Sequence, residues 1–192
     1  MTLGAHITPI SESYIKQADI VFILASNGFV EKWVQSMNSS AVSLQSFYKQ
    51  GESRNDNYND MVEAIVHQVK QGKVVAAAFY GHPGVFACVA HRAIAQVTEL
   101  GFPAKMEAGI SAEDCLYADL GIDPGRFGCT HFEASQFMLY KRQVDTSAYL
   151  VLWQVSIAGD LEFKNYEVSK AYISVLKELL LTLYPEEHRV TL

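Results

Sequence analysis

The sequence lacks the residue patterns that define several classes of protein. Its three cysteines, Cys88, Cys115 and Cys129, form no C-x-x-C pair, so neither a disulfide framework nor a zinc site is indicated. A reducing cytoplasm is the compartment that this cysteine usage favours. No H-E-x-x-H or comparable ligand spacing occurs, and no metal is expected. No apolar run approaches the roughly 18 residues of a membrane-spanning helix, and residues 1–6 lack the basic and apolar regions of a signal peptide.

The sequence is also short of basic residues. Its 15 Lys and Arg stand against 21 Asp and Glu, which gives a net charge of −6, and there is no basic run. Nucleic acid and an anionic membrane are therefore not expected as partners. What is present is apolar: 49% of the 192 residues are hydrophobic, which excludes a disordered, collagen-like or coiled-coil chain.

Apolar runs of strand length alternate with segments whose apolar residues repeat at helical spacing. Strands are predicted over residues 19–25, 41–44, 73–80, 104–107, 148–155 and 188–192. Helices are predicted over residues 11–18, 28–37, 58–71, 85–100, 111–120 and 169–184, with Ser11, Asp56 or Asn57, and Ser111 as N-caps of the first, third and fifth. Near-continuous apolar strands alternating with helices are typical of an α/β fold with a parallel sheet covered on both faces. Ligands of such sheets bind beyond the carboxyl ends of the strands, so the loops after Tyr80, Glu107 and Val155 are candidates.

The first candidate loop reads Tyr80-Gly81-His82-Pro83-Gly84-Val85-Phe86. Glycines allow a ligand to approach the backbone closely, proline fixes φ where a helix begins, and the N–H groups of a helix N-terminus attract a carboxylate or phosphate. A tight turn between strand and helix explains the same residues equally well. Since the loop is neither a P-loop nor G-x-G-x-x-G, ATP and NAD are not favoured.

Two further segments carry polar residues of interest. In Gly109-Ile110-Ser111-Ala112-Glu113-Asp114, Ser111 with Asp114 resembles a capping box, and plain helix capping is as good an interpretation as ligand binding. Ser111 lacks a G-x-S-x-G setting, which argues against a hydrolase. In the polar stretch over residues 47–57, Arg54 keeps its charge and would stabilise a tyrosinate or an oxyanion near Tyr48 and Tyr58. On residue chemistry alone, a solvated loop with an aromatic anchor is the simpler interpretation.

The segment over residues 79–128 resembles a known family. Its YGHPGVF is similar to the cofactor loop of tetrapyrrole methylases, the class III methyltransferases that use S-adenosylmethionine. Together with the downstream GISAEDCL, it resembles a narrower branch, the borosin α-N-methyltransferases, which methylate backbone amides of a ribosomally made peptide. The resemblance covers nearly the whole chain, and it favours the split bacterial type that acts on a separate precursor peptide.

The resemblance implies a role for particular residues, position by position. It implies S-adenosylmethionine as cofactor, S-adenosylhomocysteine as product, and a cytoplasmic homodimer. The implied catalytic residues are Tyr48, Arg54 and Tyr58; the implied cofactor-binding residues are Tyr80, His82, Val85, Ser111, Ala112 and Gln154. A tyrosinate, Tyr58 or Tyr48 with its pKa lowered by Arg54, would withdraw the amide proton. Arg54 or a tyrosine hydroxyl would stabilise the imidate-like oxygen.

The chain departs from the family at both ends. It starts at residues resembling those just after the family's first strand and its glycine-rich loop, and the family's second domain continues past the equivalent of Leu192. We therefore expect a methylase N-terminal α/β domain over residues 1–143 and the beginning of a second α/β domain over residues 144–192, truncated at both ends. Two alternatives remain: a methyltransferase acting on a tetrapyrrole-like small molecule, and a non-catalytic methylase-like domain that binds peptide or dimerises.

Overall fold

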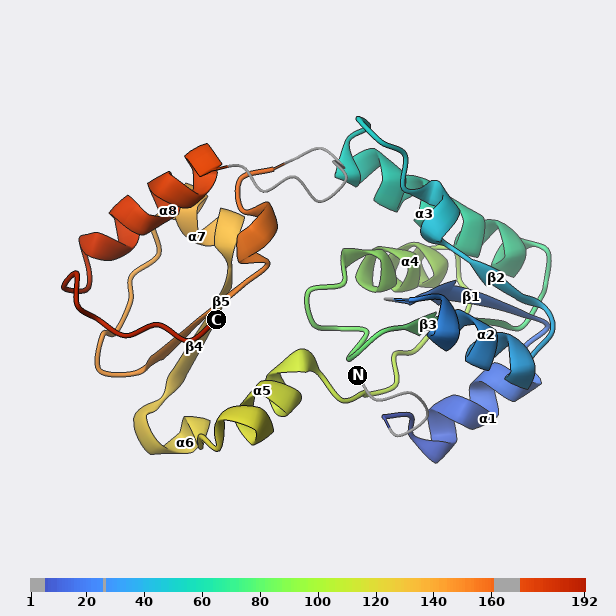
Figure 1. Cartoon of the computed structure of the whole chain (residues 1–192). Coiled ribbons are helices and arrows are strands. Elements are labelled where there is room, and N and C mark those ends of the chain that lie inside the picture. The colour runs from blue at the N-terminus through green and yellow to red at the C-terminus, as the bar shows by residue number, and fades with distance from the viewer. Residues whose placement is uncertain (1–5, 26, 161–169) are drawn as a thin grey trace. The chain divides into compact units, whose positions relative to one another are not determined.

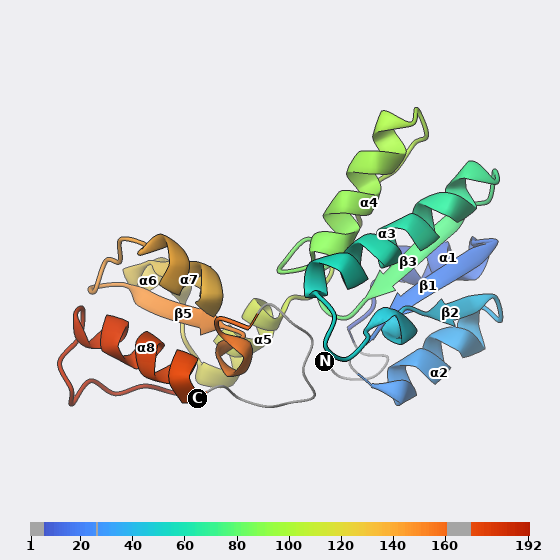
Figure 2. The same ribbon diagram turned by 90° about the horizontal axis from the view of Figure 1, so that it is seen from above.

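The structure is a computed structural model that describes residues 6–25, 27–160 and 170–192. The chain divides into two compact units, Met1–Asp119 and Leu120–Leu192. Each unit has its own parallel sheet (Figures 1 and 2). The first unit has two hydrophobic cores, and the second has one. The predicted α/β class with parallel sheets is confirmed.

The sheet of the first unit has the strand order β2-β1-β3. Strand β1 (Ile20–Leu24) pairs in parallel with β2 (Ala41–Ser43) on one side and with β3 (Val75–Phe79) on the other. Because β1 is central and covered on both faces, nearly all of its residues are buried, as its unbroken apolar sequence predicts.

Helices cover both faces of this sheet (Figure 1). Alternate residues of β1 point to opposite faces, so Val21 and Ile23 join one core while Phe22 and Leu24 join the other. Helices α1 (Pro9–Gln17) and α2 (Gly28–Met37) pack on the first face; α3 (Arg54–Lys70) and α4 (Cys88–Glu99) pack on the second. The short 3-10 helix η1 (Gln45–Phe47) leads toward α3, and α5 (Ala112–Leu120) follows the last loop of the unit.

The second unit is built on the parallel pair β4 (Cys129–Glu133) and β5 (Tyr149–Trp153). Its helices are α6 (Pro124–Phe127), α7 (Ala134–Tyr140), η2 (Val155–Ile157) and α8 (Lys170–Leu181). The core is small and centres on Phe137, Ala158 and Leu176. Strand β4 and helices α6 and α7 were not among the predicted elements. The boundary expected between residues 143 and 144 lies between two paired strands, whereas the contacts divide the chain after Asp119.

Several predicted elements differ from the structure for local reasons. Helix α1 begins at Pro9, because the Thr8 hydroxyl, rather than Ser11, accepts the capping hydrogen bond. Helix α3 begins at Arg54 after Ser53, so neither Asp56 nor Asn57 is its cap. Helix α4 begins at Cys88 instead of residue 85, since Phe86 has a φ of 52° that ends any continuous helical path. Residue 169, the predicted start of the last helix, lies outside the described residues.

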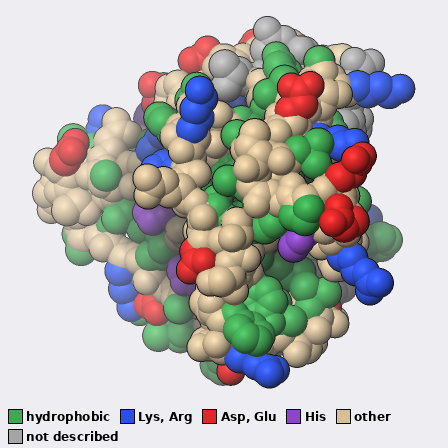
Figure 3. Space-filling view, turned by 90° about the vertical axis from the view of Figure 1, so that its left-hand side faces the viewer, with side chains coloured by type: hydrophobic (Ala, Val, Ile, Leu, Met, Phe, Trp, Pro, Cys, Tyr) green, Lys and Arg blue, Asp and Glu red, His purple; other side chains and the backbone are tan. Residues whose placement is uncertain are grey.

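Two predicted strands are not strands in the structure. Residues 104–107 and 188–192 have no ladder partner among the described residues, and a strand is defined by such pairing. Over the part of the chain that the structure describes, no helix is long and apolar enough to cross a membrane. Figure 3 shows basic and acidic side chains interspersed on one face of the molecule, without a broad field of either sign.

Candidate functional site

The loop after β3 is held by hydrogen bonds within itself and to α4. The Gly84 N–H donates to Nδ1 of His82 at 2.9 Å, and the Val85 N–H donates to the His82 carbonyl oxygen at 3.1 Å. His91 on α4 donates from Nε2 to the Gly84 carbonyl oxygen at 2.9 Å. His82 therefore stabilises the turn by accepting both hydrogen bonds, and the one to its carbonyl oxygen positions Val85.

The loop over residues 106–111 packs backbone to backbone against this turn. A Cβ atom placed on Gly109 would lie 2.7 Å from the Gly81 carbonyl oxygen, and one placed on Gly84 would lie 2.8 Å from the Met106 sulfur. Only glycine permits the approach at Gly109, because its neighbour is backbone, whereas the neighbour of Gly84 is the end of the flexible Met106 side chain. The structure thus brings together the two segments that the sequence singled out separately.

Ser111 and Asp114 form the reciprocal cap that their spacing predicts. The Ser111 N–H and hydroxyl donate to Oδ2 of Asp114 at 2.7 and 2.8 Å, and the Asp114 N–H donates back to the Ser111 hydroxyl oxygen at 3.2 Å. The bonds from Ser111 hold the pKa of Asp114 below its usual range, with a smaller contribution from the charge of His82. Ser111 is 7% exposed, and Ala112 opens helix α5 beside it.

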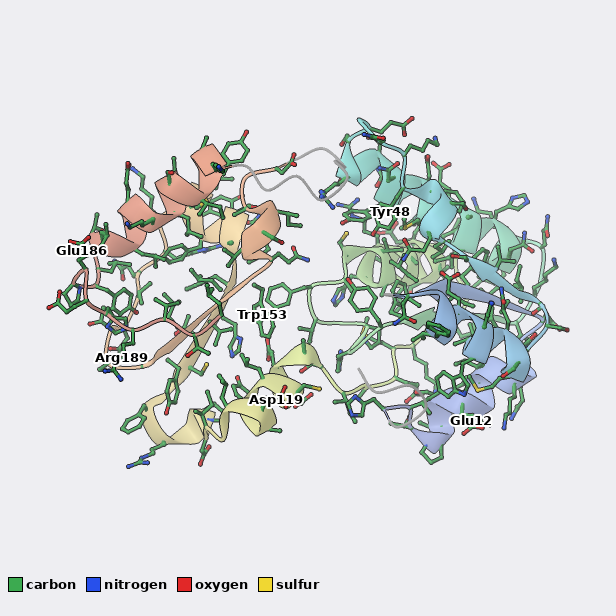
Figure 4. The ribbon with its side chains drawn as sticks, viewed as in Figure 1. Glu12, Tyr48, Asp119, Trp153, Glu186 and Arg189 are labelled. Atoms are coloured by element: carbon green, nitrogen blue, oxygen red, sulfur yellow. The ribbon has the colours of Figure 1, made fainter. Side chains whose placement is uncertain are left out.

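Tyr48, Arg54 and Tyr58 come together around the start of α3. Tyr48 follows η1, Arg54 is the first residue of α3, and Tyr58 lies one turn later (Figure 4 labels Tyr48). The Tyr48 and Tyr58 rings meet edge to face, with centroids 6.1 Å apart and an interplanar angle of 81°. All three residues are half-buried.

Tyr80 connects this cluster with the loop after β3. Burial raises the pKa of Tyr48 well above its ordinary value, and the charge of Tyr58, a hydrogen bond with Tyr58 and the charge of Tyr80 raise it further. Arg54 lowers the pKa of Tyr48, but its effect is the smallest of these. Partial burial and the charge of Tyr58 also raise the pKa of Tyr80, which is 53% exposed. Tyr48, Arg54, Tyr58 and Tyr80 are therefore close enough to share one electrostatic environment.

This environment corrects one expectation. Tyr48 is not a tyrosinate prepared by Arg54, because burial and two neighbouring phenols outweigh the guanidinium charge. Burial therefore disfavours the tyrosinate form of Tyr48.

Asn57 is a residue of this cluster that sequence reasoning assigned only to capping. It lies in the first turn of α3 between Arg54 and Tyr58 and is completely buried. Neither its amide nitrogen nor its amide oxygen has a hydrogen-bond partner within the described residues. The sequence signal available was its place within the repeated helical apolar positions, three residues after Arg54.

Gln154 belongs to the second unit, at the carboxyl end of β5, where Figure 4 labels its neighbour Trp153. Its φ of 59° places it in the left-handed region, which costs a residue other than glycine about 1–2 kcal/mol. Strain of this kind is concentrated at functional sites. Within the described residues, no group of three His, Cys, Asp or Glu side chains is placed to hold a metal ion.

Solved structures define the class of fold. A conserved hypothetical protein from Aeropyrum pernix has a TM-score of 0.53 at 21% identity over 70% of this chain and 45% of that one. A diphthine synthase has a TM-score of 0.55 at 15% identity over 92% of this chain and 65% of that one. The family described as Tetrapyrrole (Corrin/Porphyrin) Methylases matches residues 3–192. The chain therefore belongs to the tetrapyrrole methylase family.

Curated relatives narrow the resemblance further. A methyltransferase/type I borosin cyclic peptide precursor of Coprinopsis marcescibilis is 42% identical over 83% of this chain and 41% of its own length. A methyltransferase/gymnopeptides precursor of Gymnopus fusipes is 39% identical over 97% of this chain and 44% of its own length. A methyltransferase/omphalotin A precursor of Omphalotus olearius is 41% identical over 93% of this chain and 43% of its own length. The chain thus spans less than half the length of these relatives.

The comparisons do not support the split bacterial type expected from the sequence. The three relatives described are fungal, and the name of each joins a methyltransferase with a peptide precursor.

Proposed function

We propose that this chain carries the active site of a methyltransferase that uses S-adenosylmethionine to methylate backbone amides of a ribosomally made precursor peptide. The observation that carries the proposal is the position of Tyr80. It belongs to the turn that packs against the loop over residues 106–111, and it shares its electrostatic environment with Tyr48 and Tyr58. The proposed cofactor loop and the proposed proton-handling groups therefore both lie near the carboxyl end of β3.

The residues fit the cofactor. The two loops meet backbone to backbone at Gly81 and Gly109, close to the half-exposed Tyr80 ring. Tyr80, His82, Val85, Ser111 and Ala112 would hold S-adenosylmethionine in the first unit. For Gln154, in the second unit, a cofactor contact is what the family resemblance implies. When bound, S-adenosylmethionine supplies an electrophilic methyl group on its sulfonium.

The chain's own residues would prepare the amide. An amide nitrogen is a poor nucleophile because its lone pair is delocalised into the carbonyl group. Burial raises the pKa of Tyr48 and of Tyr80, which disfavours a tyrosinate at either position. We assign acceptance of the amide proton to Tyr58, whose ring meets Tyr48 edge to face. Arg54 would stabilise the negative charge that develops on the amide oxygen. Tyr48, in hydrogen-bonding contact with Tyr58, would position that phenol.

A peptide substrate is favoured over a tetrapyrrole because relatives about 40% identical are named for peptide precursors. The family as a whole is named for tetrapyrroles, so the small-molecule reaction is the alternative that an assay must separate. We also propose that the protein is a homodimer located in the cytoplasm, and light scattering tests the homodimer.

The test pairs two substitutions with a matched control. Tyr58→Phe and Arg54→Ala are expected to retain binding of S-adenosylmethionine by calorimetry but to lose ~10²-fold or more in methyl transfer to a synthetic apolar peptide. Tyr140→Phe, an exposed tyrosine of the second unit, is expected to behave as the parent chain. Normal turnover by the first two variants would refute their roles. If the parent chain neither binds the cofactor nor transfers methyl, the non-catalytic alternative holds.

A further inference from the structure

The first turn of α3 has little stabilisation from its own residues. Its N-cap residue, Ser53, makes no side-chain capping hydrogen bond. Asn55, Asn57 and Asn59 follow, and asparagine is a poor helix former. Asn57 is in addition buried, and its amide has no hydrogen-bond partner within the described residues. Asp56 complements the helix dipole, which is a weak contribution at an exposed position. The helical form of this turn therefore depends on another element.

Arg92 on α4 supplies the contact that the turn needs. Helices α3 and α4 pack side by side on one face of the sheet (Figures 1 and 2). The Arg92 guanidinium donates from Nη1 to the Asn59 amide oxygen and from Nη2 to the Asn55 amide oxygen, both at 2.8 Å. Asn55 and Asn59 are four positions apart and therefore lie on one side of the helix. The planar guanidinium thus spans one turn of α3 and bonds to both of its ends.

The spanned turn carries two residues of the candidate site. Arg54 comes directly before Asn55 in the chain, and Tyr58 comes directly before Asn59. A rotation of this turn about the helix axis would break both bonds from α4 and would move Arg54 and Tyr58 together. The two bonds therefore fix the orientation of both side chains.

Helix α4 also holds the loop after β3. His91, the neighbour of Arg92, donates from Nε2 to the Gly84 carbonyl oxygen at 2.9 Å. Adjacent residues of α4 thus bind the candidate cofactor loop and the turn of α3 that carries candidate catalytic residues. A helix bonded to both segments sets the distance between them.

We propose that Arg92 is a positioning residue for methyl transfer, which holds the first turn of α3 so that Arg54 and Tyr58 face the reacting amide. Arg92 and its two asparagine partners are exposed, so the bonds act through their geometry rather than through strong electrostatics. Lysine would keep the charge but could not bridge two oxygens in the same way, because its ammonium group is a single point. The inference rests on the proposed function, whereas the contact of Arg92 with α3 can be tested without it.

The kinetic test compares Arg92→Ala and Arg92→Lys with Gln96→Ala, an exposed residue one turn later on α4. We expect kcat for methyl transfer to a synthetic apolar peptide to fall about tenfold or more for Arg92→Ala, because small displacements of catalytic groups slow a reaction strongly. The kcat of Arg92→Lys should stay lowered, and the KM for S-adenosylmethionine should change less than about twofold in both variants. Gln96→Ala should match the parent chain. Full activity of Arg92→Lys would overturn the proposal, since charge alone would suffice.

Substitution of both partners tests whether the three side chains act as one unit. Asn55→Ala combined with Asn59→Ala should lower kcat as much as Arg92→Ala does. Adding Arg92→Ala to that pair should cause no further loss, because the same contact is already removed. Losses that multiply would show that Arg92 acts elsewhere and would overturn the proposal.

Amide hydrogen exchange tests the contact itself. In Arg92→Ala, exchange should become about tenfold faster at Asn57 and Tyr58, in the first turn, and stay unchanged at Ile65 and Val66, in the buried middle of α3. Unchanged exchange in the first turn would refute the role of Arg92, even if the parent chain transfers methyl. Faster exchange in a chain that transfers no methyl would refute the proposed function and still support the contact of Arg92 with α3.

Discussion

Replacing Gly109 with alanine should weaken the first unit through one steric contact. The added Cβ would lie 2.7 Å from the Gly81 carbonyl oxygen and 3.3 Å from Cα of His82. Both are backbone atoms, and neither can move without shifting the turn after β3. Gly109 has no positive φ, so the alanine backbone is acceptable and the cost is steric alone. Overpacking of this kind costs about 1–3 kcal/mol.

Gly28→Ala is the matched control. Gly28 is the first residue of α2, and a Cβ there would meet nothing within 4 Å. Removing a glycine from a helix reduces the entropy of the unfolded chain, so this change should leave stability equal or raise it by up to about 1 kcal/mol.

Urea unfolding followed by tryptophan fluorescence measures the difference. The chain has two tryptophans, Trp33 in the first unit and Trp153 in the second. In a Trp153→Phe background, the signal of Trp33 reports the first unit alone. We expect the free energy of unfolding to fall by about 1–3 kcal/mol for Gly109→Ala relative to Gly28→Ala. Equal stability of the two variants would refute the packing of one loop against the other.

Three further predictions follow from the same site. Asn57→Leu should raise the free energy of unfolding by about 1 kcal/mol, because it replaces a buried amide that has no partner; a fall in thermal and urea stability would refute the burial. Because folding raises the pKa of Tyr48, the free energy of unfolding should fall as pH rises above the ordinary tyrosine pKa of 10.0. Tyr48→Phe should reduce that fall in alkaline denaturation. An unchanged dependence of stability on pH would contradict this prediction. The pKa of Asp114 is lowered, so its capping hydrogen bonds stabilise α5 above the ordinary carboxyl pKa, and this stabilisation is lost as pH falls below that value. Asp114→Asn should therefore remove a step from the acid pH profile of amide exchange in α5. A step that persists in this variant would exclude the cap as its source.

The elements that the sequence predicted best are those whose burial follows from the spacing of their own apolar residues. Strand β1 and helix α2 lie within about one residue of their predicted bounds. A buried strand and an amphipathic helix each have a characteristic spacing of apolar residues, which can be recognised in the local sequence. Residues 104–107 were mispredicted for the opposite reason. A strand requires a neighbour, and apolar composition does not reveal whether one is paired there.

In the candidate site too, local features were predictable from the sequence, and features that depend on the fold were not. The cap between Ser111 and Asp114 is local, and its residues and partners were predictable from a spacing of three. The close approach of Gly81 and Gly109, separated by 28 positions in the numbering, depends on the fold and left no local signal. The pKa of Tyr48 was mispredicted because burial, which sequence spacing does not give, outweighs the nearby charge of Arg54.

Isotope-labelled S-adenosylmethionine provides a direct test of methyl transfer to backbone nitrogen. The chain would be incubated with a synthetic apolar peptide, with a matched peptide whose backbone nitrogens are all methylated already, and with a tetrapyrrole. Fragmentation mass spectrometry would then locate the label. We expect labelled methyl groups on backbone nitrogens of the first peptide and none on the second. Label on side chains of both peptides, or on the tetrapyrrole alone, would contradict it.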